Sequence, residues 1–249
     1  MTSGLHEFES RLSRLHPAAA VMSVAVSGLL VTCTLFVGAG LLVTRQLGGL
    51  TQWDDSVVRW IADRRTSALN TWTGYATMLA DTLGILVVLL VTTVVLVVLH
   101  HRSEALLLLA AICLELAAFL TVNAVVGRPR PDVARLGSLP STSSFPSGHM
   151  AATVALYGGL AVIVNARLRD RIVGLVAWFV ALGAAVVVGL ARVYRGMHHP
   201  SDVVAGALLG FAVLAVAVIA VRVGQQAVAE RKRSHTPLPA FPLDRVAET

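Results

Sequence analysis

The sequence predicts an all-α membrane protein, a bundle of six transmembrane helices with a short interfacial amphipathic helix. Composition is the first observation. Of the 249 residues, 56% are hydrophobic and 14% are charged, whereas a soluble domain carries charge on about a quarter of its residues. The second observation is length, because roughly 20 apolar residues cross a bilayer. Six apolar runs come near that length: residues 18–44, 82–99, 105–127, 150–166, 172–191 and 203–221.

The first apolar run, residues 18–44, is longer than the core of a secretory signal and has no clear cleavage site. We therefore expect a retained helix. The loop after it carries an apolar stripe at the spacing of one helix face: Trp53, Val57, Trp60 and Ile61. Charged residues, among them Asp54 and Asp55, fill much of the remaining surface. The stripe predicts an amphipathic helix, either in the membrane interface or packed on neighbouring spans.

An even number of spans places both ends of the chain on one side of the membrane. That side collects eleven of the twenty Lys and Arg residues, so the positive-inside rule makes it cytoplasmic. We expect a multi-pass protein of the cell inner (plasma) membrane with a cytoplasmic tail at residues 1–17 and a six-span domain at residues 18–224. Residues 225–249 are polar, contain three prolines and are expected to be a disordered basic tail.

Other classes of function receive no support from the sequence. The formal net charge is +6, but no basic helix or interleaving of basic and aromatic residues indicates a nucleic-acid partner. Cys33 and Cys113 both lie inside apolar runs, where small buried hydrophobic residues are more common than a disulfide or a metal pair. The expected partner is the lipid bilayer, and the sequence does not indicate an oligomeric state.

Polar residues gather at four span boundaries. Arg128 and Arg130 follow the third span, and Ser147-Gly148-His149 begins the fourth. Arg192 ends the fifth span, while His198 and Asp202 begin the sixth. Odd spans end and even spans begin on the same side, so these residues should meet in an active site at one membrane face.

Pro146-Ser147-Gly148-His149 predicts a helix start that can bind an anion. Ser147 can cap the helix, and Gly148 lets a ligand approach the backbone closely. Free N–H groups at such a terminus favour phosphate. The alternative interpretation is an ordinary helix cap beside an interfacial histidine.

His198 and Asp202 are four residues apart, about one helical turn, which places the carboxylate within reach of the ring. Asp202 could then accept Nδ1–H and leave Nε2 free to attack phosphorus. The spacing leaves His199 open as the reacting histidine, and a capping aspartate beside a surface histidine pair is a further alternative.

The arginines at the same boundaries are permanently charged and match phosphate oxygens with two donors each. They are Arg128, Arg130, Arg192 and Arg195. Anchoring to anionic lipid headgroups is the alternative role, above all for Arg128 and Arg195.

Together these motifs resemble the type 2 phosphatidic acid phosphatase superfamily, whose signature is Lys-x6-Arg-Pro, Pro-Ser-Gly-His and Ser-Arg-x5-His-x3-Asp. The second part is complete at residues 146–149. The third reads Ala191-Arg192-x5-His198-x3-Asp202 and selects His198 over His199, while the first reads Asn123-x6-Arg130-Pro131. The resemblance covers roughly residues 70–220, with all three parts in order.

The resemblance implies an integral-membrane phosphatase acting on a lipid phosphate or diphosphate at the outer face. Undecaprenyl diphosphate, phosphatidic acid and phosphatidylglycerol phosphate are the expected substrate types. His198 would form a phosphohistidine, Asp202 would orient it, and His149 would protonate the leaving oxygen and then activate water. The implied phosphate-binding residues are Arg130, Arg192, Ser147, Gly148, Asn123 and Arg128. No metal or other cofactor is expected, because the arginines supply the positive charge.

Two positions depart from the signature. Asn123 replaces the lysine and Ala191 replaces the serine, which removes a charge and a hydroxyl from the implied phosphate site. These losses leave open a non-catalytic lipid-binding membrane protein. A lipid phosphotransferase with the same intermediate is a separate alternative.

Glu115 is an ionisable residue within the third apolar run, and such residues are functional candidates. It lies about 12 Å along the helix from Asn123, too deep for contact with phosphate. We expect a protonated, hydrogen-bonded structural role.

Overall fold

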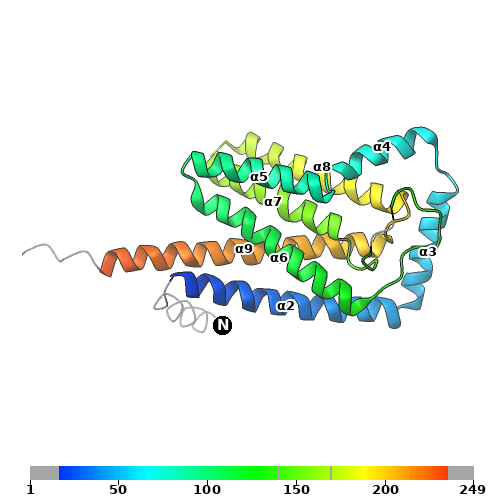
Figure 1. Cartoon of the computed structure of the whole chain (residues 1–249), viewed down its shortest axis with the longest axis horizontal. Helices are drawn as coiled ribbons and strands as arrows, with labels where there is room; N and C mark the ends of the chain where they lie inside the picture. Colours follow the sequence, from blue (N-terminus) through cyan, green and yellow to red (C-terminus); the bar gives the residue numbers. More distant parts are fainter. Residues whose placement is uncertain (1–16, 139–140, 169, 235–249) are drawn as a thin grey trace, which may run out of the picture.

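The computed structural model describes residues 17–138, 141–168 and 170–234, and these form helices without strands. The helices are α2 (Pro17–Arg45), α3 (Gly48–Ala62), α4 (Ser67–Met78), α5 (Thr82–Val98), α6 (Arg102–Val126), α7 (Gly148–Arg167), α8 (Arg171–Tyr194) and α9 (Pro200–Ser234) (Figure 1). The all-α class predicted from the sequence is confirmed.

Five helices in the described part of the chain are long and apolar enough to cross a membrane: α2, α6, α7, α8 and α9. A sixth span results if α4 and α5, which meet at an angle of 41°, are counted as one broken span. The predicted span at residues 82–99 corresponds to α5, which has only 17 residues. Helix α4 has no counterpart in the sequence analysis, since its residues mix polar and aromatic types without an apolar run.

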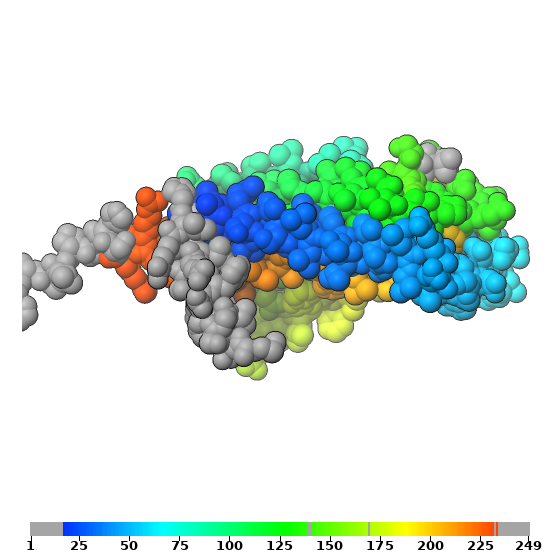
Figure 2. Space-filling model, turned by 90° about the horizontal axis from the view of Figure 1, so that it is seen from below, coloured from blue at the N-terminus to red at the C-terminus, as the bar shows by residue number. Residues whose placement is uncertain are grey.

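The outer surface of the bundle is apolar. Leu35 on α2, Leu83 on α5 and Phe179 on α8 are 64%, 74% and 70% exposed. Helix α2 forms one long side of the molecule (Figure 2) and carries several such residues. A soluble protein rarely exposes so much continuous apolar surface, so this exterior suits the hydrocarbon of a membrane.

Helix α7 lies at the centre of the bundle and packs against α6, α8 and α9. The approach of α9 depends on two glycines, because a Cβ at Gly206 would clash with the Ser147 carbonyl and one at Gly210 with the Ala151 carbonyl. Small residues let helix backbones come close together in membranes. The start of α9 is thereby held against the start of α7.

The four polar span boundaries meet at one end of the bundle. The segment between α6 and α7 and the turn between α8 and α9 lie beside α3, far from the first described residues of α2 and the end of α9 (Figure 1). Gly127 and Gly196 have φ values of 62° and 69°, a conformation that glycine adopts without strain. The predicted gathering of these boundaries is confirmed.

The last helix is longer than expected. Helix α9 continues through residues 225–234, where the polar composition predicts the beginning of a disordered tail. Ala, Gln, Glu, Lys and Arg dominate this stretch and are strong helix formers. The remaining expected tail segments, residues 1–16 and 235–249, lie outside the described residues.

Candidate active site

A cavity of about 320 Å³ opens at the end of the bundle where the polar boundaries meet. Five of the nine predicted site residues line it: Arg130, Gly148, His149, Arg192 and His198. They come from the segment after α6, the start of α7, the end of α8 and the turn before α9. The structure thus brings residues from all three sequence motifs around one space.

His198 is 2% exposed and its ring is held in one orientation. Its Nδ1 lies 2.8 Å from the Ser144 carbonyl oxygen, so Nδ1 carries the proton and donates it. Nε2 then carries the lone pair, which accepts a hydrogen bond from Arg130 Nη1 at 3.4 Å. Burial lowers the pKa of His198 well below 6.5; Asp202 opposes this shift, and Arg192 and Arg130 reinforce it. The ring is therefore neutral at pH 7, as a nucleophile must be.

The hydrogen bond expected between His198 and Asp202 is not the one that forms. Asp202 Oδ2 lies 4.0 Å from His198 Nδ1, because the Ser144 carbonyl occupies that position. Asp202 instead accepts from Ser144 Oγ at 2.5 Å and from Arg128 at 2.6 Å. It therefore acts on His198 indirectly, by fixing the residue whose carbonyl orients the ring.

His199 has both ring nitrogens engaged. Nδ1 lies 3.0 Å from Asp202 Oδ2, and Nε2 lies 3.1 Å from Asp55 Oδ1. The ring is buried and is not among the side chains that line the cavity. Since no free nitrogen is directed at the cavity, the geometry favours His198 as the reacting histidine.

Arg128 is a brace rather than a cavity residue. Its guanidinium donates to Asp54 at 2.8 Å, to Asp202 at 2.6 Å and to Ser201 Oγ at 2.8 Å. Burial opposes its charge, but the two carboxylates raise its pKa above the ordinary value. These bonds direct the guanidinium at the two carboxylates, and Arg128 is not among the residues that line the cavity, so the phosphate contact expected of Arg128 is not supported.

Helix α3 contributes more to this brace than its sequence indicates. Asp54 is fully buried and accepts from the Ser201 amide at 3.0 Å, while its other oxygen accepts from Ser201 Oγ and Arg128. The expectation that Asp54 lies on an open surface is therefore wrong. Trp53 and Trp60 are more than half exposed, as an interfacial helix requires.

Asn123 also faces away from the cavity. Its Nδ2 donates to the Ser143 and Phe145 carbonyls at 3.0 and 3.1 Å, and its Oδ1 accepts from the Ser143 amide at 2.9 Å. Both ends of the amide are thus used to hold the segment before α7. Asn123 shapes the backbone that carries Ser144 and does not offer a donor to phosphate.

Arg130 and Arg192 remain as the cationic lining of the cavity. Arg130 donates to the Met197 and Ser143 carbonyls at 2.6 and 3.1 Å. Burial lowers its pKa and Asp202 opposes the shift, but arginine stays charged at neutral pH. Arg192 Nε is buried and has no hydrogen-bond partner among the described residues.

The start of α7 supplies further unused donors. Ser147 Oγ is buried without a partner in the described part of the chain, and it makes no capping bond. The first amides of a helix, here those following Ser147, have no partner within the helix. Unsatisfied buried donors are rare in proteins and need an explanation. A phosphate bound in the cavity would accept from the amides of Gly148 and His149, which line it, whereas Ser147 is not among the lining residues.

His149 is paired with a residue that the sequence analysis missed. Its Nε2 lies 3.1 Å from Asp81 Oδ1, and Asp81 stands at the break between α4 and α5 and is half-exposed. The one sequence feature that indicates Asp81 is its position directly before an apolar run, which is typical of a helix cap. The other missed residue, Ser144, lies in a polar segment without a recognisable pattern.

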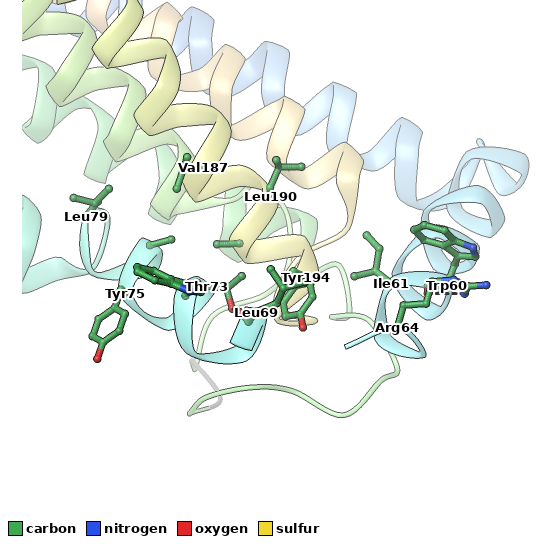
Figure 3. A pocket seen from close by; sticks show the side chains of 13 residues that line it. Trp60, Ile61, Arg64, Leu69, Thr73, Tyr75, Leu79, Val187, Leu190 and Tyr194 are labelled. Carbon is green, nitrogen blue, oxygen red and sulfur yellow. Dashed lines mark hydrogen bonds between the residues drawn. The ribbon is translucent and has the colours of Figure 1, made fainter. Parts of the chain in front are cut away.

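A second, larger groove of about 750 Å³ lies between α3, α4 and α8. Figure 3 shows its lining, which includes Trp60, Leu190 and Tyr194. Of the described residues that line it, none is a histidine or a carboxylate, so it lacks the groups for phosphate chemistry. Ala191, which replaces the serine of the family signature, belongs to this lining. A serine at position 191 would therefore face this groove and not the site cavity.

Comparison with known proteins agrees with the motifs. The family model described as PAP2 superfamily matches residues 104–225. The chain is similar to "Probable diacylglycerol pyrophosphate phosphatase 1" of Schizosaccharomyces pombe, with 33% identity over 39% of this chain and 46% of the relative. Phosphatidylglycerophosphatase B of Bacillus subtilis is 36% identical over 34% of this chain and 42% of its own length. Lipid A 1-phosphatase of Rhizobium johnstonii is 32% identical over 40% and 41%. The chain thus spans less than half the length of these relatives.

Two crystal structures share the fold. One is a transmembrane PAP2-type phosphatidylglycerolphosphate phosphatase from Bacillus subtilis, with a TM-score of 0.67, 21% identity, and coverage of 86% of this chain and 98% of that chain. The other is LpxE of Aquifex aeolicus, with a TM-score of 0.52, 24% identity, and coverage of 67% and 93%. The chain therefore shares its arrangement of helices with these two structures.

Proposed function

Because the chain belongs to the PAP2 superfamily through residues 104–225, we propose that it is a membrane phosphatase that hydrolyses a lipid phosphate or diphosphate. One observation carries the proposal. His198 presents an unprotonated Nε2 to a cavity that it shares with Arg130, Arg192 and His149. A neutral nucleophile, two cations that hold phosphoryl oxygens and a second histidine that can act as acid and base are sufficient for transfer of a phosphoryl group.

The first step forms a phosphohistidine. The substrate phosphate binds between Arg130 and Arg192, and Arg130 turns its N–H from Nε2 to a phosphoryl oxygen. Nε2 of His198 attacks phosphorus, the bond from phosphorus to the leaving oxygen breaks, and His149 gives that oxygen its proton. The arginines and the amides at the start of α7 hold the phosphoryl oxygens while charge redistributes.

The second step releases phosphate. His149, now neutral, takes a proton from a water molecule, and the water oxygen attacks phosphorus. The bond between phosphorus and Nε2 breaks, which returns His198 to its starting form and frees inorganic phosphate. The Ser144 carbonyl keeps Nδ1–H in place throughout. Arginine provides the positive charge, so we expect turnover without a metal ion.

A lipid substrate fits the position of the cavity. Beyond the polar groups its walls are apolar and come from α5, α6 and α7, with Leu86, Leu116 and Ala152 among them. A phosphate can therefore lie at the membrane face while its chain extends toward hydrocarbon. Undecaprenyl diphosphate, phosphatidic acid and phosphatidylglycerol phosphate are the candidate types. We place the site at the outer face of the inner membrane, with both termini cytoplasmic.

The proposal is tested by phosphate release in detergent from these three lipids, with EDTA present. We expect activity in the wild type and a loss of at least about a thousandfold in His198→Ala, since removing a nucleophile abolishes its step. His101→Ala, which removes a histidine just before α6 at the opposite end of the bundle, is the matched control and should keep wild-type turnover. Wild-type turnover in His198→Ala would refute the mechanism.

An added acceptor alcohol separates hydrolysis from transfer, because a phosphotransferase would then make a phosphorylated alcohol in place of free phosphate.

A further inference from the structure

Glu115 is a carboxyl group in the wall of the site cavity, in the middle of α6. It is 5% exposed and lines the same cavity as His149 and His198. Among the described residues, no hydrogen bond or ion pair engages its carboxyl group. The hydrogen-bonded structural role expected from the sequence therefore lacks the partner that it needs.

The side chains next to Glu115 on α6 offer nothing in place of that partner. Its neighbours along α6 that line the cavity are Ile112, Leu116 and Phe119, none of which can form a hydrogen bond through its side chain. A carboxyl group in such surroundings is expected to be the neutral acid, because burying an unpaired charge is too costly. A neutral acid without an acceptor still loses free energy. Because Glu115 lines the cavity, a molecule that fills the cavity can supply the acceptor.

The depth of Glu115 indicates which part of that molecule it meets. The ring of Phe119 packs against Gly148 at the start of α7, where phosphate is proposed to bind. Glu115 lies one helical turn from Phe119, about 6 Å farther from the membrane face. It is thus beside the atoms that directly follow the phosphate on the lipid, and not beside the phosphate itself.

We propose that Glu115 is a specificity residue that donates a hydrogen bond to an ester carbonyl of a glycerolipid phosphate, a few bonds beyond phosphorus. The inference rests on the proposed phosphatase function and narrows its substrate class. A polyprenyl phosphate has only hydrocarbon at that depth and would leave Glu115 unpaired. Sites built to form a hydrogen bond discriminate strongly against analogues that lack the partner.

The test compares kcat/KM for three lipids: dioleoyl phosphatidic acid, its diether analogue without ester carbonyls, and a polyprenyl phosphate. In the wild type we expect the ester lipid to exceed each of the others by about tenfold. Glu115→Leu should reduce both ratios to near one, whereas Glu115→Gln, which can still donate, should keep most of the preference. An unchanged ratio in Glu115→Leu would overturn the inference.

The matched controls are Glu104→Leu and Glu104→Gln, at the other end of α6, where the carboxylate pairs with Arg167 outside the site cavity. Both should keep the wild-type ratios. If Glu115→Leu does not fold, the wild type alone decides, because equal kcat/KM for the ester and diether lipids would refute the contact. Phosphate release from lipids without an ester preference would overturn this inference alone. No release from any lipid would overturn the proposed function as well.

Discussion

The site has two sides. The cavity side is the lining formed by Arg130, His149, Arg192 and His198, and the bracing side is the buried cluster of Arg128, Asp54, Ser201 and Asp202. Both sides contain buried arginines, but with different partners. On the cavity side, Arg192 Nε is buried without a partner. On the bracing side, Arg128 is buried between two carboxylates and donates to both. A buried donor without a partner makes a site ready for a ligand, whereas donors paired with buried carboxylates hold the chain in place. We therefore expect changes on the cavity side to alter rate, and changes on the bracing side to alter stability.

The largest effect is expected for Arg128→Ala. It leaves Asp54 and Asp202 buried without their cation, which typically costs about 3–5 kcal/mol of the free energy of unfolding. Thermal unfolding in detergent measures the loss. Arg135→Ala, at an exposed position in the same segment, is the control and should change stability by no more than about 0.5 kcal/mol. Equal melting temperatures for Arg128→Ala and the wild type would contradict a stabilising role of Arg128.

Arg192→Ala should show the opposite pattern. Loss of a cationic donor to the transferring phosphoryl group is expected to lower kcat by about 100-fold to 1,000-fold. Stability should change by less than about 1 kcal/mol, because Arg192 Nε satisfies no other group in the described residues. Steady-state kinetics and thermal unfolding on the same preparation provide both values. A drop in melting temperature as large as that of Arg128→Ala would contradict the claim that the cavity side affects rate and not stability.

Asn123→Lys tests the bracing side from another position. Lysine would recreate the family signature, but it cannot accept from the Ser143 amide and would bury a charge where the Asn123 side chain now donates to two carbonyls. We expect a loss of about 1–3 kcal/mol in stability and no gain in rate. Phosphate release and thermal unfolding decide this. A faster enzyme would mean that position 123 faces phosphate after all.

The smallest expected effect is a dependence of stability on pH. Burial lowers the pKa of His198, so the folded protein keeps the ring neutral where the unfolded chain takes up a proton, near pH 6.5. Stability is therefore complete above pH 6.5 and decreases below it, by up to about 1.4 kcal/mol per pH unit. His198→Asn, which does not titrate, should lose less stability between about pH 7.5 and 5.5. Parallel unfolding curves for the two proteins would contradict a buried neutral ring.

The sequence was sufficient for the fold class and for the gathering of the motifs. Apolar run length determines the spans, and the alternation of chain direction forces residues 128–130, His149, Arg192 and His198 to one end. Helix α4 is not predicted from the sequence, because a broken span has no single apolar run. The predicted end of the last helix is wrong because the prolines beyond residue 234 indicate disorder, whereas residues 225–234 favour helix.

Side-chain direction within the motifs could not be read from spacing. Arg128 and Arg130 are two residues apart in a segment without regular structure, where no period fixes which one faces the cavity. The partners of Arg128 and His198, Asp54 and Ser144, are separated from them by 74 and 54 residues. Contacts over such distances depend on how α3 and the segment before α7 pack, which local patterns do not contain.

The most direct test of the central claim is to trap the phosphorylated protein. Wild-type protein is mixed with a lipid carrying a labelled phosphate, quenched in alkaline detergent after a single turnover, and digested for mass analysis. We predict label on the peptide that contains His198, at its Nε2, and none in His198→Ala. A wild type that releases phosphate while the label is found on His199, or on no residue, would contradict the account.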